Sequence, residues 1–325
     1  MTQIRIADLR HPRLSAAETT TVMKARLVWL VLCVIWGSTW LFIKLGLEAL
    51  PPITFAAIRF IISCTIIFVI IRIRGIRLPR ARADWTLLAI CGILSFTLNY
   101  GLVFWGEQYI SSGLAALLQA TLPAFGLVFA HFHLPAERLS WARIGGVVLG
   151  VCGVGVVFSN QLAIAGTMAL AGCVALILSA MFAAYSNVLV KAYGKHLDPA
   201  VLAAGQMLFG LSVLLVVGIP LEGNPLRFHW TSMALIALLY LAVVGTVIAF
   251  LLYYWLVLNM DVTKSMLIAL VTPVVAVLLG MIVLDEQIGW RTLAGGAMIM
   301  LGIALIVVRK ARKQEEALTT SVAAD

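Results

Sequence analysis

Long apolar blocks are the feature that most limits what this chain can fold into. They run for roughly 18 to 25 residues between short polar breaks, the length that a helix needs to cross ~30 Å of hydrocarbon at a rise of 1.5 Å per residue. Hydrophobic residues make up 62% of the 325 residues and charged residues 11%, whereas soluble domains are about half apolar and about a quarter charged. The sequence therefore predicts an all-α protein that crosses a membrane many times.

The apolar blocks predict ten spans. They run near residues 27–46, 53–72, 84–105, 110–132, 141–159, 166–190, 199–220, 231–256, 262–284 and 290–308. An even number places both termini on one side. Every Lys and Arg except Lys44, Arg59, Arg227 and Arg291 falls in the tails and loops of that side, so the positive-inside rule predicts cytoplasmic termini. The net charge of +9 thus reflects the orientation of the protein in the membrane. No nucleic-acid partner is expected.

The two halves of the chain resemble each other. An offset of 147 residues places Lys44 on Lys191 and Arg59 on Gln206, and an offset of 150 places Pro123 on Pro273. Because each half holds five spans, an odd number, the two copies must cross the membrane in opposite directions, which is typical of transporters. We therefore expect a tail at 1–26, repeats at 27–160 and 161–308 around a central cavity, and a tail at 309–325.

The segments IWGSTWLFIKLGL, LPPITFAAIRF, LPAERLSWARIGGVVLGVCGVGVV and LDEQIGWRTLAGGAMIMLGIALIVV resemble the EamA family of the drug/metabolite transporter superfamily. The resemblance covers about residues 27–308. It implies ten helices, cytoplasmic termini, a central cavity and movement of small metabolites across a bacterial inner membrane. As a pattern it is specific for the family and weak for the substrate.

Polar and aromatic residues within the spans are the candidate substrate-binding residues, since an unmatched polar group in hydrocarbon costs several kcal/mol. The set predicted to bind substrate is Trp36, Ser38, Thr39, Arg59, Asn99, Gln119, Tyr185, Asn187, Gln206 and Tyr254. Arg59 leaves two interpretations open. Its side chain either reaches the outer headgroups, or it faces the cavity, where it anchors a substrate carboxylate or pairs with Glu107. The polar repeat partner, Gln206, favours the cavity.

Pro123 and Pro273 lie near the middles of the fourth and ninth spans. A proline inside a helix frees a backbone carbonyl, which a cavity can satisfy, so both are predicted to be hinges near the site; kinks that only shape packing are the alternative. Glu107 is predicted to act at the outer mouth as a gate or ion-pair residue, with a solvated loop carboxylate as the alternative.

Glycines recur in the fifth and tenth spans, in GGVVLGVCGVG and GGAMIMLG. Such glycines let helices approach closely, so these spans are predicted packing surfaces, and a homodimer through them is one arrangement considered. The five cysteines lie in apolar segments without CxxC spacing, and two histidines in H-x-H point to different faces of a helix. No metal and no cofactor are expected.

What the sequence lacks bears on energy coupling and cargo. There is no P-loop motif and no Asp or Glu in the middle of a span, so neither ATP hydrolysis nor the usual carboxylate proton relay is supported. The sequence therefore favours an exporter or a facilitator. Proton coupling through residues at a cavity mouth is an alternative that the sequence does not decide. Cationic cargo is disfavoured, because the first span carries VIWGSTW where small multidrug transporters of the superfamily carry a carboxylate. Amino acids or related zwitterionic or weakly anionic compounds are favoured.

Three other functional classes are the alternatives to a metabolite transporter. An intramembrane enzyme would need a nucleophile or metal motif, and neither G-x-S-x-G nor H-E-x-x-H is present, so no enzyme is predicted. A scaffold without flux would not need polar residues at matching depths in both halves. A lipid or lipid-carrier flippase of the same superfamily is the alternative among transporters. The predicted partners are a small-molecule substrate and the lipid bilayer.

Overall fold

The computed structural model describes residues 16–133, 141–164, 166–259 and 268–305. Within these ranges every regular element is a helix. Seven helices are long and apolar enough to cross a membrane, and three shorter apolar helices accompany them. The prediction of an all-α protein with many apolar helices is confirmed at this level, and the arrangement of ten spans in two inverted repeats stays a prediction.

The first half of the chain contains eight labelled elements. They are α1 (Ala16–Leu47), α2 (Pro52–Ile73), α3 (Arg82–Gly92), the π-helix η1 (Ile93–Asn99), α4 (Tyr100–Glu107), α5 (Ser112–Gln119), α6 (Leu122–His133) and α7 (Trp141–Ile164). Two departures from plain helices matter for the site. The span Arg82–Glu107 is π-helical in its middle, and the predicted fourth span is interrupted between α5 and α6, just before Pro123.

The second half begins with the long helix α8. Its elements are α8 (Gly166–Tyr193), α9 (Pro199–Glu222), the 3-10 turn η2 (Pro225–Arg227), α10 (Ser232–Leu239), the π-helix η3 (Tyr240–Ile248), α11 (Ala249–Asn259), α13 (Ile268–Val283) and a last helix, Trp290–Leu305. A π-helical middle thus recurs in this half, between α10 and α11. Pro273 lies inside α13 without ending it.

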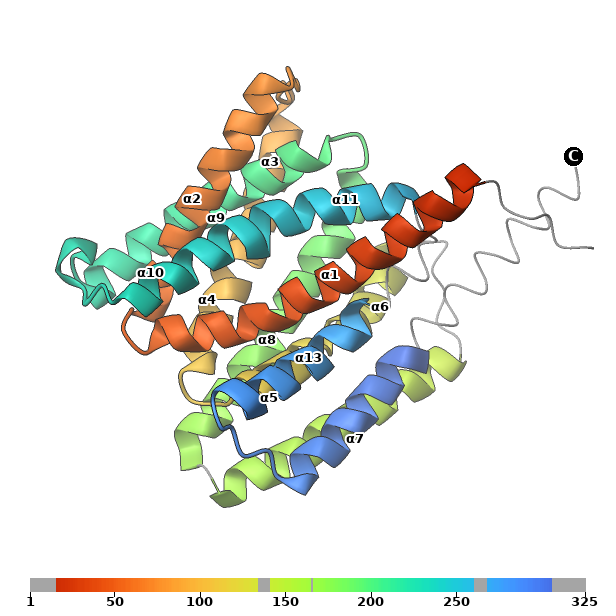
Figure 1. Ribbon diagram of the computed structural model, residues 1–325, viewed down its shortest axis with the longest axis vertical. Helices are drawn as coiled ribbons and strands as arrows, with labels where there is room; N and C mark the ends of the chain where they lie inside the picture. The colour runs from red at the N-terminus through yellow and green to blue at the C-terminus, as the bar shows by residue number, and fades with distance from the viewer. Residues whose placement is uncertain (1–15, 134–140, 165, 260–267, 306–325) are drawn as a thin grey trace, which may run out of the picture.

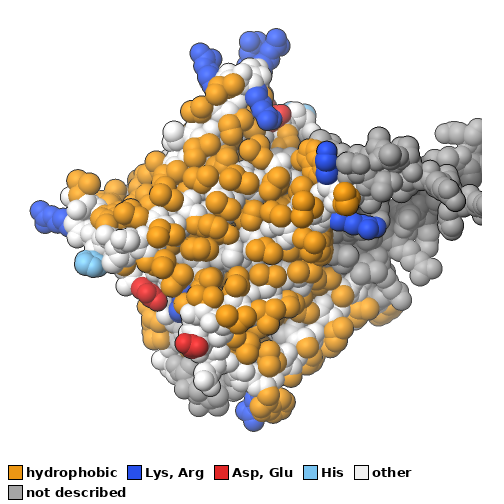
Figure 2. All heavy atoms as spheres, viewed as in Figure 1, with side chains coloured by type: hydrophobic (Ala, Val, Ile, Leu, Met, Phe, Trp, Pro, Cys, Tyr) orange, Lys and Arg blue, Asp and Glu red, His pale blue; other side chains and the backbone are white. Residues whose placement is uncertain are grey.

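Helices from the two halves pack against one another. The main pairs are α2 with α9, α1 with α13 and α6 with α8 (Figure 1). Phe55 and Phe60 of α2 and Phe104 of α4 are among the largest fully buried side chains. Figure 2 shows hydrophobic side chains over most of one face of the molecule, with Lys and Arg at its margins. A face of this kind suits contact with lipid.

The glycine-rich spans pack against each other within the chain. A Cβ atom at Gly153 in α7 would lie 2.6 Å from the carbonyl oxygen of Gly295 in the last helix, and a Cβ at Gly295 would lie 2.6 Å from the carbonyl oxygen of Gly153. Only glycine allows two helix backbones to approach this closely. Figure 1 shows the two helices side by side at one edge of the molecule. The expected packing role is therefore seen, and the homodimer stays a prediction.

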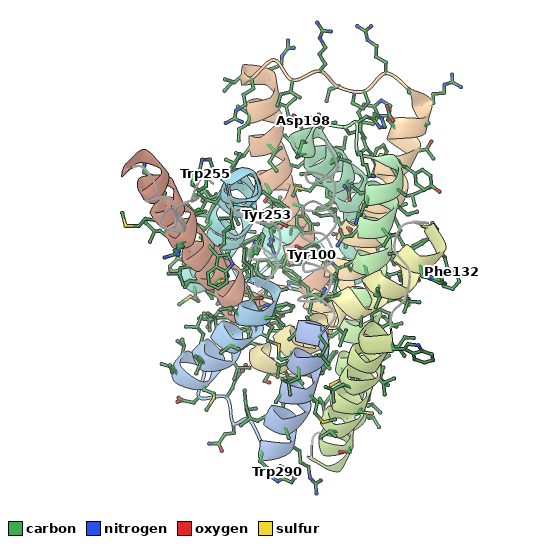
Figure 3. All side chains as sticks on the ribbon, turned by 90° about the vertical axis from the view of Figure 1, so that its right-hand side faces the viewer. Tyr100, Phe132, Asp198, Tyr253, Trp255 and Trp290 are labelled. Carbon is green, nitrogen blue, oxygen red and sulfur yellow. The ribbon has the colours of Figure 1, made fainter. Side chains whose placement is uncertain are left out.

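The molecule has two ends. At the first, called the Lys44 end, α1 finishes and α2 and α5 begin; at the second, called the Lys191 end, α2 and α8 finish and α9 begins. Figure 3 shows Trp290 at the first end and Asp198 near the second, with Tyr100 and Tyr253 between them. By the positive-inside prediction the Lys44 end faces outward.

Candidate functional site

A cavity of about 750 Å³ lies between helices of the two halves. The first half supplies residues of α1, α2, η1, α4, α5 and α6 to its wall, and the second half supplies residues of α8, η3, α11 and α13. The labelled Tyr100 and Tyr253 mark its level in Figure 3. This is the central cavity that the sequence predicted.

Eight of the predicted residues line this cavity. They are Trp36, Thr39, Arg59, Asn99, Gln119, Asn187 and the two prolines, Pro123 and Pro273. They come from seven helices that are far apart in the sequence. The structure brings them together, and their roles, substrate binding for six of them and hinges for the two prolines, stay predictions.

Arg59 is buried inside the protein, with 3% of its surface exposed. Its Nε and Nη2 donate to Thr246 Oγ1 at 3.3 and 3.1 Å. Its guanidinium carbon lies 5.2 Å from the ring centre of Tyr100, 5.3 Å from that of Phe60 and 6.0 Å from that of Phe104, contacts worth about 0.5–2 kcal/mol each when desolvated. Nη1 has no hydrogen-bond partner. Arg59 thus faces the cavity and does not reach the outer headgroups.

The π-helix η3 positions the arginine. Thr246 belongs to η3 and donates its own hydroxyl proton to the carbonyl oxygen of Leu241 at 2.8 Å, which leaves its oxygen free to accept from the guanidinium. The neighbouring Gly245 leaves room for the side chains, because a Cβ there would lie 2.9 Å from Thr39 Cγ2 and 3.9 Å from Arg59 Nη2. π-Helical turns often occur at functional sites for this reason.

Amide and hydroxyl side chains form a chain of hydrogen bonds on another part of the wall. Ser179 Oγ donates to Gln119 Oε1 at 2.7 Å, Gln119 Nε2 donates to Asn99 Oδ1 at 3.1 Å, and Asn99 Nδ2 donates to the carbonyl oxygen of Ser95 at 3.1 Å. Each amide is therefore held by partners on η1, α5 and α8. The arrangement fixes the polar wall before any solute enters.

Aromatic rings complete the wall. Trp36 and Tyr253 lie with their ring centres 5.4 Å apart, and Trp40 and Tyr100 also line the cavity. An apolar wall with a few fixed polar groups is the usual form of a small-molecule site.

Three predicted residues lie elsewhere. Ser38 Oγ is 2.7 Å from Tyr240 Oη, a hydrogen bond between α1 and η3. Tyr185 packs against Phe129, with ring centres 5.0 Å apart. Gln206 is buried where α9 meets the end of α3. Among the described residues, none of the three lines the cavity, because the rotation of each helix, which the sequence leaves open, turns them toward neighbouring helices. The side chain of Tyr254 lies outside the described part.

Glu107 is fully buried, which corrects the alternative of a solvated loop carboxylate. It does not pair with Arg59, whose Nε and Nη2 bond Thr246 instead. Lys44 is the nearby cation, and its Nζ donates to the carbonyl oxygens of Glu107 and Ile110 at 2.7 Å each. Both carboxyl oxygens of Glu107 lack a hydrogen-bond partner. Glu107 is thus part of the Lys44 end and does not line the cavity.

Several residues outside the predicted binding set also line the cavity. Tyr100, Tyr253 and Thr272 are polar or aromatic residues within spans, so the criteria used for the others also fit them. Lys191 lines the cavity and was visible only as the repeat partner of Lys44. Thr246 was missed although it is a polar residue in the eighth predicted span. No group of three or more potential metal ligands occurs in the part of the chain that the structure describes.

The comparison with protein families decides the identity. The model of the EamA-like transporter family matches residues 23–159 and again residues 170–308. The chain belongs to this family. The resemblance to the EamA family noted in the sequence is confirmed. This EamA-like transporter contains two regions that each match the family model. The description of the family and the names of its relatives are those of transporters.

Relatives match nearly the whole chain. The uncharacterized transporter YoaV of Bacillus subtilis is 27% identical over 87% of this chain and 96% of its own length. The uncharacterized inner membrane transporter YedA of Escherichia coli K12 is 29% identical over 85% of this chain and 87% of its own. A probable terminal-alkyne amino-acid exporter of Streptantibioticus cattleyicolor is 28% identical over 91% and 98%. The chain is thus a multi-pass membrane protein of a transporter family.

A solved crystal structure resembles this EamA-like transporter over its length. The TM-score is 0.62 at 21% sequence identity, and the alignment covers 90% of this chain and 99% of the other. At this identity the likeness shows the fold alone.

Proposed function

We propose that this EamA-like transporter carries small zwitterionic or weakly anionic metabolites, amino acids among them, through the cavity by alternating access. Arg59 carries the proposal. It is a buried cation on the cavity wall whose Nη1 lacks a partner, and no carboxylate of the described residues lies within ion-pair distance of it. An uncompensated buried charge is costly, so a substrate carboxylate is the group that suits this position.

Other features of the wall support this cargo. No Asp or Glu occurs among the described lining residues, whereas Arg59 and Lys191 both do. The wall is therefore basic and selects against organic cations. Trp36, Tyr100 and Tyr253 offer apolar surface for the rest of the solute. The relative named as a probable amino-acid exporter handles cargo of the proposed class, and no relative described above is named as a flippase.

We also infer the finer architecture from these observations. Two matches to the family model support two repeats of five helices each, and an odd number makes them inverted. The distribution of Lys and Arg supports cytoplasmic termini in a bacterial inner membrane, where the protein acts as an exporter or facilitator. A homodimer through α7 and the last helix would use the faces turned away from the contact of Gly153 with Gly295.

Transport by purified full-length protein in proteoliposomes tests the proposal. The panel is amino acids, nucleosides, sugars and cationic dyes, each with and without a pH gradient. We expect amino acids to move, and Arg59→Gln to lower their transport roughly 10- to 100-fold, the effect of losing a charged hydrogen-bonded pair. Arg59→Lys should be intermediate, because lysine keeps the charge without the planar donor fork.

Arg72→Gln is the matched control, since Arg72 is an exposed arginine in the last turn of the same helix. It should leave transport within about twofold, because exposed charges contribute little. Movement of dyes alone, or full amino-acid transport by Arg59→Gln, would refute the proposed function.

A further inference from the structure

Two prolines of the cavity wall, Pro123 and Pro273, each remove the usual helical donor of a backbone carbonyl. Proline has no N–H, so the carbonyl oxygen four residues earlier loses its usual helical donor. Pro123 removes the donor for Gln119, the last residue of α5, and Pro273 removes the donor for Ala269 in α13. All four residues line the cavity. One such carbonyl therefore comes from each half of the chain.

Two amide oxygens of the cavity wall already accept hydrogen bonds from neighbouring side chains. Gln119 Oε1 accepts from Ser179, and Asn99 Oδ1 accepts from Gln119. Thr39 Oγ1 donates to the carbonyl oxygen of Trp36, and Thr272 Oγ1 donates to that of Ile268, so these two hydroxyl oxygens are also acceptors on the wall. With no carboxylate among the described lining residues, the carbonyl oxygens of Gln119 and Ala269 are the groups of negative partial charge that the prolines leave open to a ligand.

The residues that bear these carbonyls share the cavity wall with Arg59, whose Nη1 lacks a hydrogen-bond partner. Arg59 lies over the ring of Tyr100, Tyr100 follows Asn99 in the chain, and Asn99 accepts a hydrogen bond from Gln119. On the other side, Arg59 Nη2 lies beside Gly245, which contacts Thr39 of α1. Helix α1 also contacts α13 next to Pro273, because Gly37 of α1 lies against Thr272 of α13. Arg59 and the two residues that bear these carbonyls thus all line one space of about 750 Å³.

We propose that the carbonyl oxygens of Gln119 and Ala269 bind the ammonium group of the substrate, opposite Arg59 at its carboxylate. This inference rests on the proposed function and narrows the cargo to α-amino acids with a primary amine. Carbonyls released from interrupted helices bind cations in other transporters. The negative ends of the peptide dipoles make them suitable acceptors for N⁺–H donors. The prolines then serve recognition in addition to shaping the helices.

The first test needs only the unaltered protein. Binding to the full-length chain in lipid nanodiscs is measured for L-leucine, L-phenylalanine, their deaminated acids 4-methylpentanoate and 3-phenylpropionate, and their N,N,N-trimethyl derivatives. We expect roughly 10- to 100-fold weaker binding of both altered sets, the range for hydrogen bonds to a charged group. The trimethyl compounds keep the positive charge but donate no hydrogen bond. Equal binding of these and the amino acids would overturn the carbonyl site.

The second test restores the missing donors. Pro273→Ala and Pro123→Ala supply an N–H to the carbonyls of Ala269 and Gln119, so each should lower the preference for the amino acid over its deaminated acid about tenfold. Pro220→Ala is the matched control, since Pro220 lies inside α9 and outside the cavity wall. It should leave the preference unchanged. If Pro273→Ala and Pro123→Ala weaken binding of the amino acid and of its deaminated acid equally, the proposal is overturned. The prolines would then only shape the helices.

Failure of this inference is distinguishable from failure of the proposed function. Arg59→Gln should weaken the amino acid and its deaminated acid alike, because both carry the carboxylate. If amino acids and deaminated acids bind equally well and both need Arg59, only the ammonium site is wrong. If neither binds, the proposed function is wrong as well.

Discussion

Lys44 and Lys191 occupy matching positions in the two halves, yet the two ends of the cavity treat them differently. Lys44 donates to backbone carbonyls in the connection between α4 and α5, and it does not line the cavity. Lys191 is an exposed residue that does line it. One lysine thus joins helices, whereas the other contributes positive charge to the wall. Equivalent sequence positions therefore do not imply equivalent roles.

The Lys44 end is closed by further contacts between side chains and backbone. Glu286 accepts hydrogen bonds from the backbone N–H groups of Ser112 and Gly113 at 2.7 and 3.3 Å. Glu222 accepts from those of Ile53 and Thr54 at 2.8 and 2.7 Å. The two acids satisfy the open N–H groups of α5 and α2, as capping residues do. Because the partners come from distant helices, each contact also holds the bundle together at this end.

At the Lys191 end the cavity wall includes an exposed residue, Lys191. His196 Nε2 lies 2.8 Å from Asp84 Oδ1 at the surface. The cavity wall extends toward this end through Gly126, Ala130 and Lys191. We infer that the structure is closed at the Lys44 end and open toward the Lys191 end, which is the cytoplasmic side in the predicted orientation.

The largest expected effect comes from breaking the closed end. Lys44→Ala removes the donor of two buried backbone carbonyls, those of Glu107 and Ile110, so we expect about 1–3 kcal/mol of destabilisation for each carbonyl. Thermal unfolding measures it. Ile43 lines the cavity, so the thiol of Ile43→Cys should also become reactive to a membrane-impermeant reagent added at the Lys44 side when Lys44 is replaced. The labelling is done in a Cys152→Ser background, because Cys152 is exposed.

Lys195→Ala at the other end is the control for Lys44→Ala. Lys195 is exposed, so its loss should change the unfolding free energy by about 0.5 kcal/mol or less. An unchanged melting temperature for Lys44→Ala, with Ile43→Cys still unreactive, would show that the lysine does not hold this end closed.

A smaller effect separates the two ends by packing. A Cβ at Gly280 would meet the carboxylate of Glu286 and lie 2.9 Å from Ser112 Oγ, whereas a Cβ at Gly126 meets nothing within 4 Å. Gly280→Ala should therefore cost roughly 1–3 kcal/mol through overpacking. Gly126→Ala should be neutral or stabilise by up to about 1 kcal/mol through helix propensity. Thermal unfolding of both variants measures the difference, and equal values would contradict the comparison.

The smallest effect concerns Lys191. An exposed charge at the wall of an open cavity attracts anionic solutes only weakly, so Lys191→Gln should lower transport of an amino acid by about two- to fivefold at low salt. The difference should vanish at high ionic strength, where exposed charges are screened. Lys195→Gln, which lies outside the cavity wall, should show no loss. A loss that persists at high salt would instead indicate direct contact with the substrate.

Much of the fold was predictable from the sequence because membrane spans are specified locally. Length and hydropathy predict the apolar helices, and the matching residues of the two halves predict the paired units that the family model also matches. The π-helical middles at η1 and η3 were not predictable, since a wider helical turn depends on tertiary contacts, such as those of Arg59 with Thr246.

The site was predictable in part. A polar residue within a span is a good candidate because hydrocarbon penalises it, and Arg59, Asn99 and Gln119 all line the cavity. The same criterion selected Gln206 and Tyr185, which face neighbouring helices instead. The criterion states that a polar group needs a partner, and it leaves open whether that partner is a solute or another helix.

By itself the sequence determined that this chain is a helical membrane protein of the EamA-like transporter family with polar residues inside its spans. Those properties follow from the cost of placing polar groups in hydrocarbon, which each segment meets alone. Only the tertiary structure decided which polar groups share the cavity and which acids cap the helices at the Lys44 end. It also decided which nitrogen of Arg59 lacks a partner within the protein. Such choices depend on the rotation and contact of helices that lie far apart in the chain.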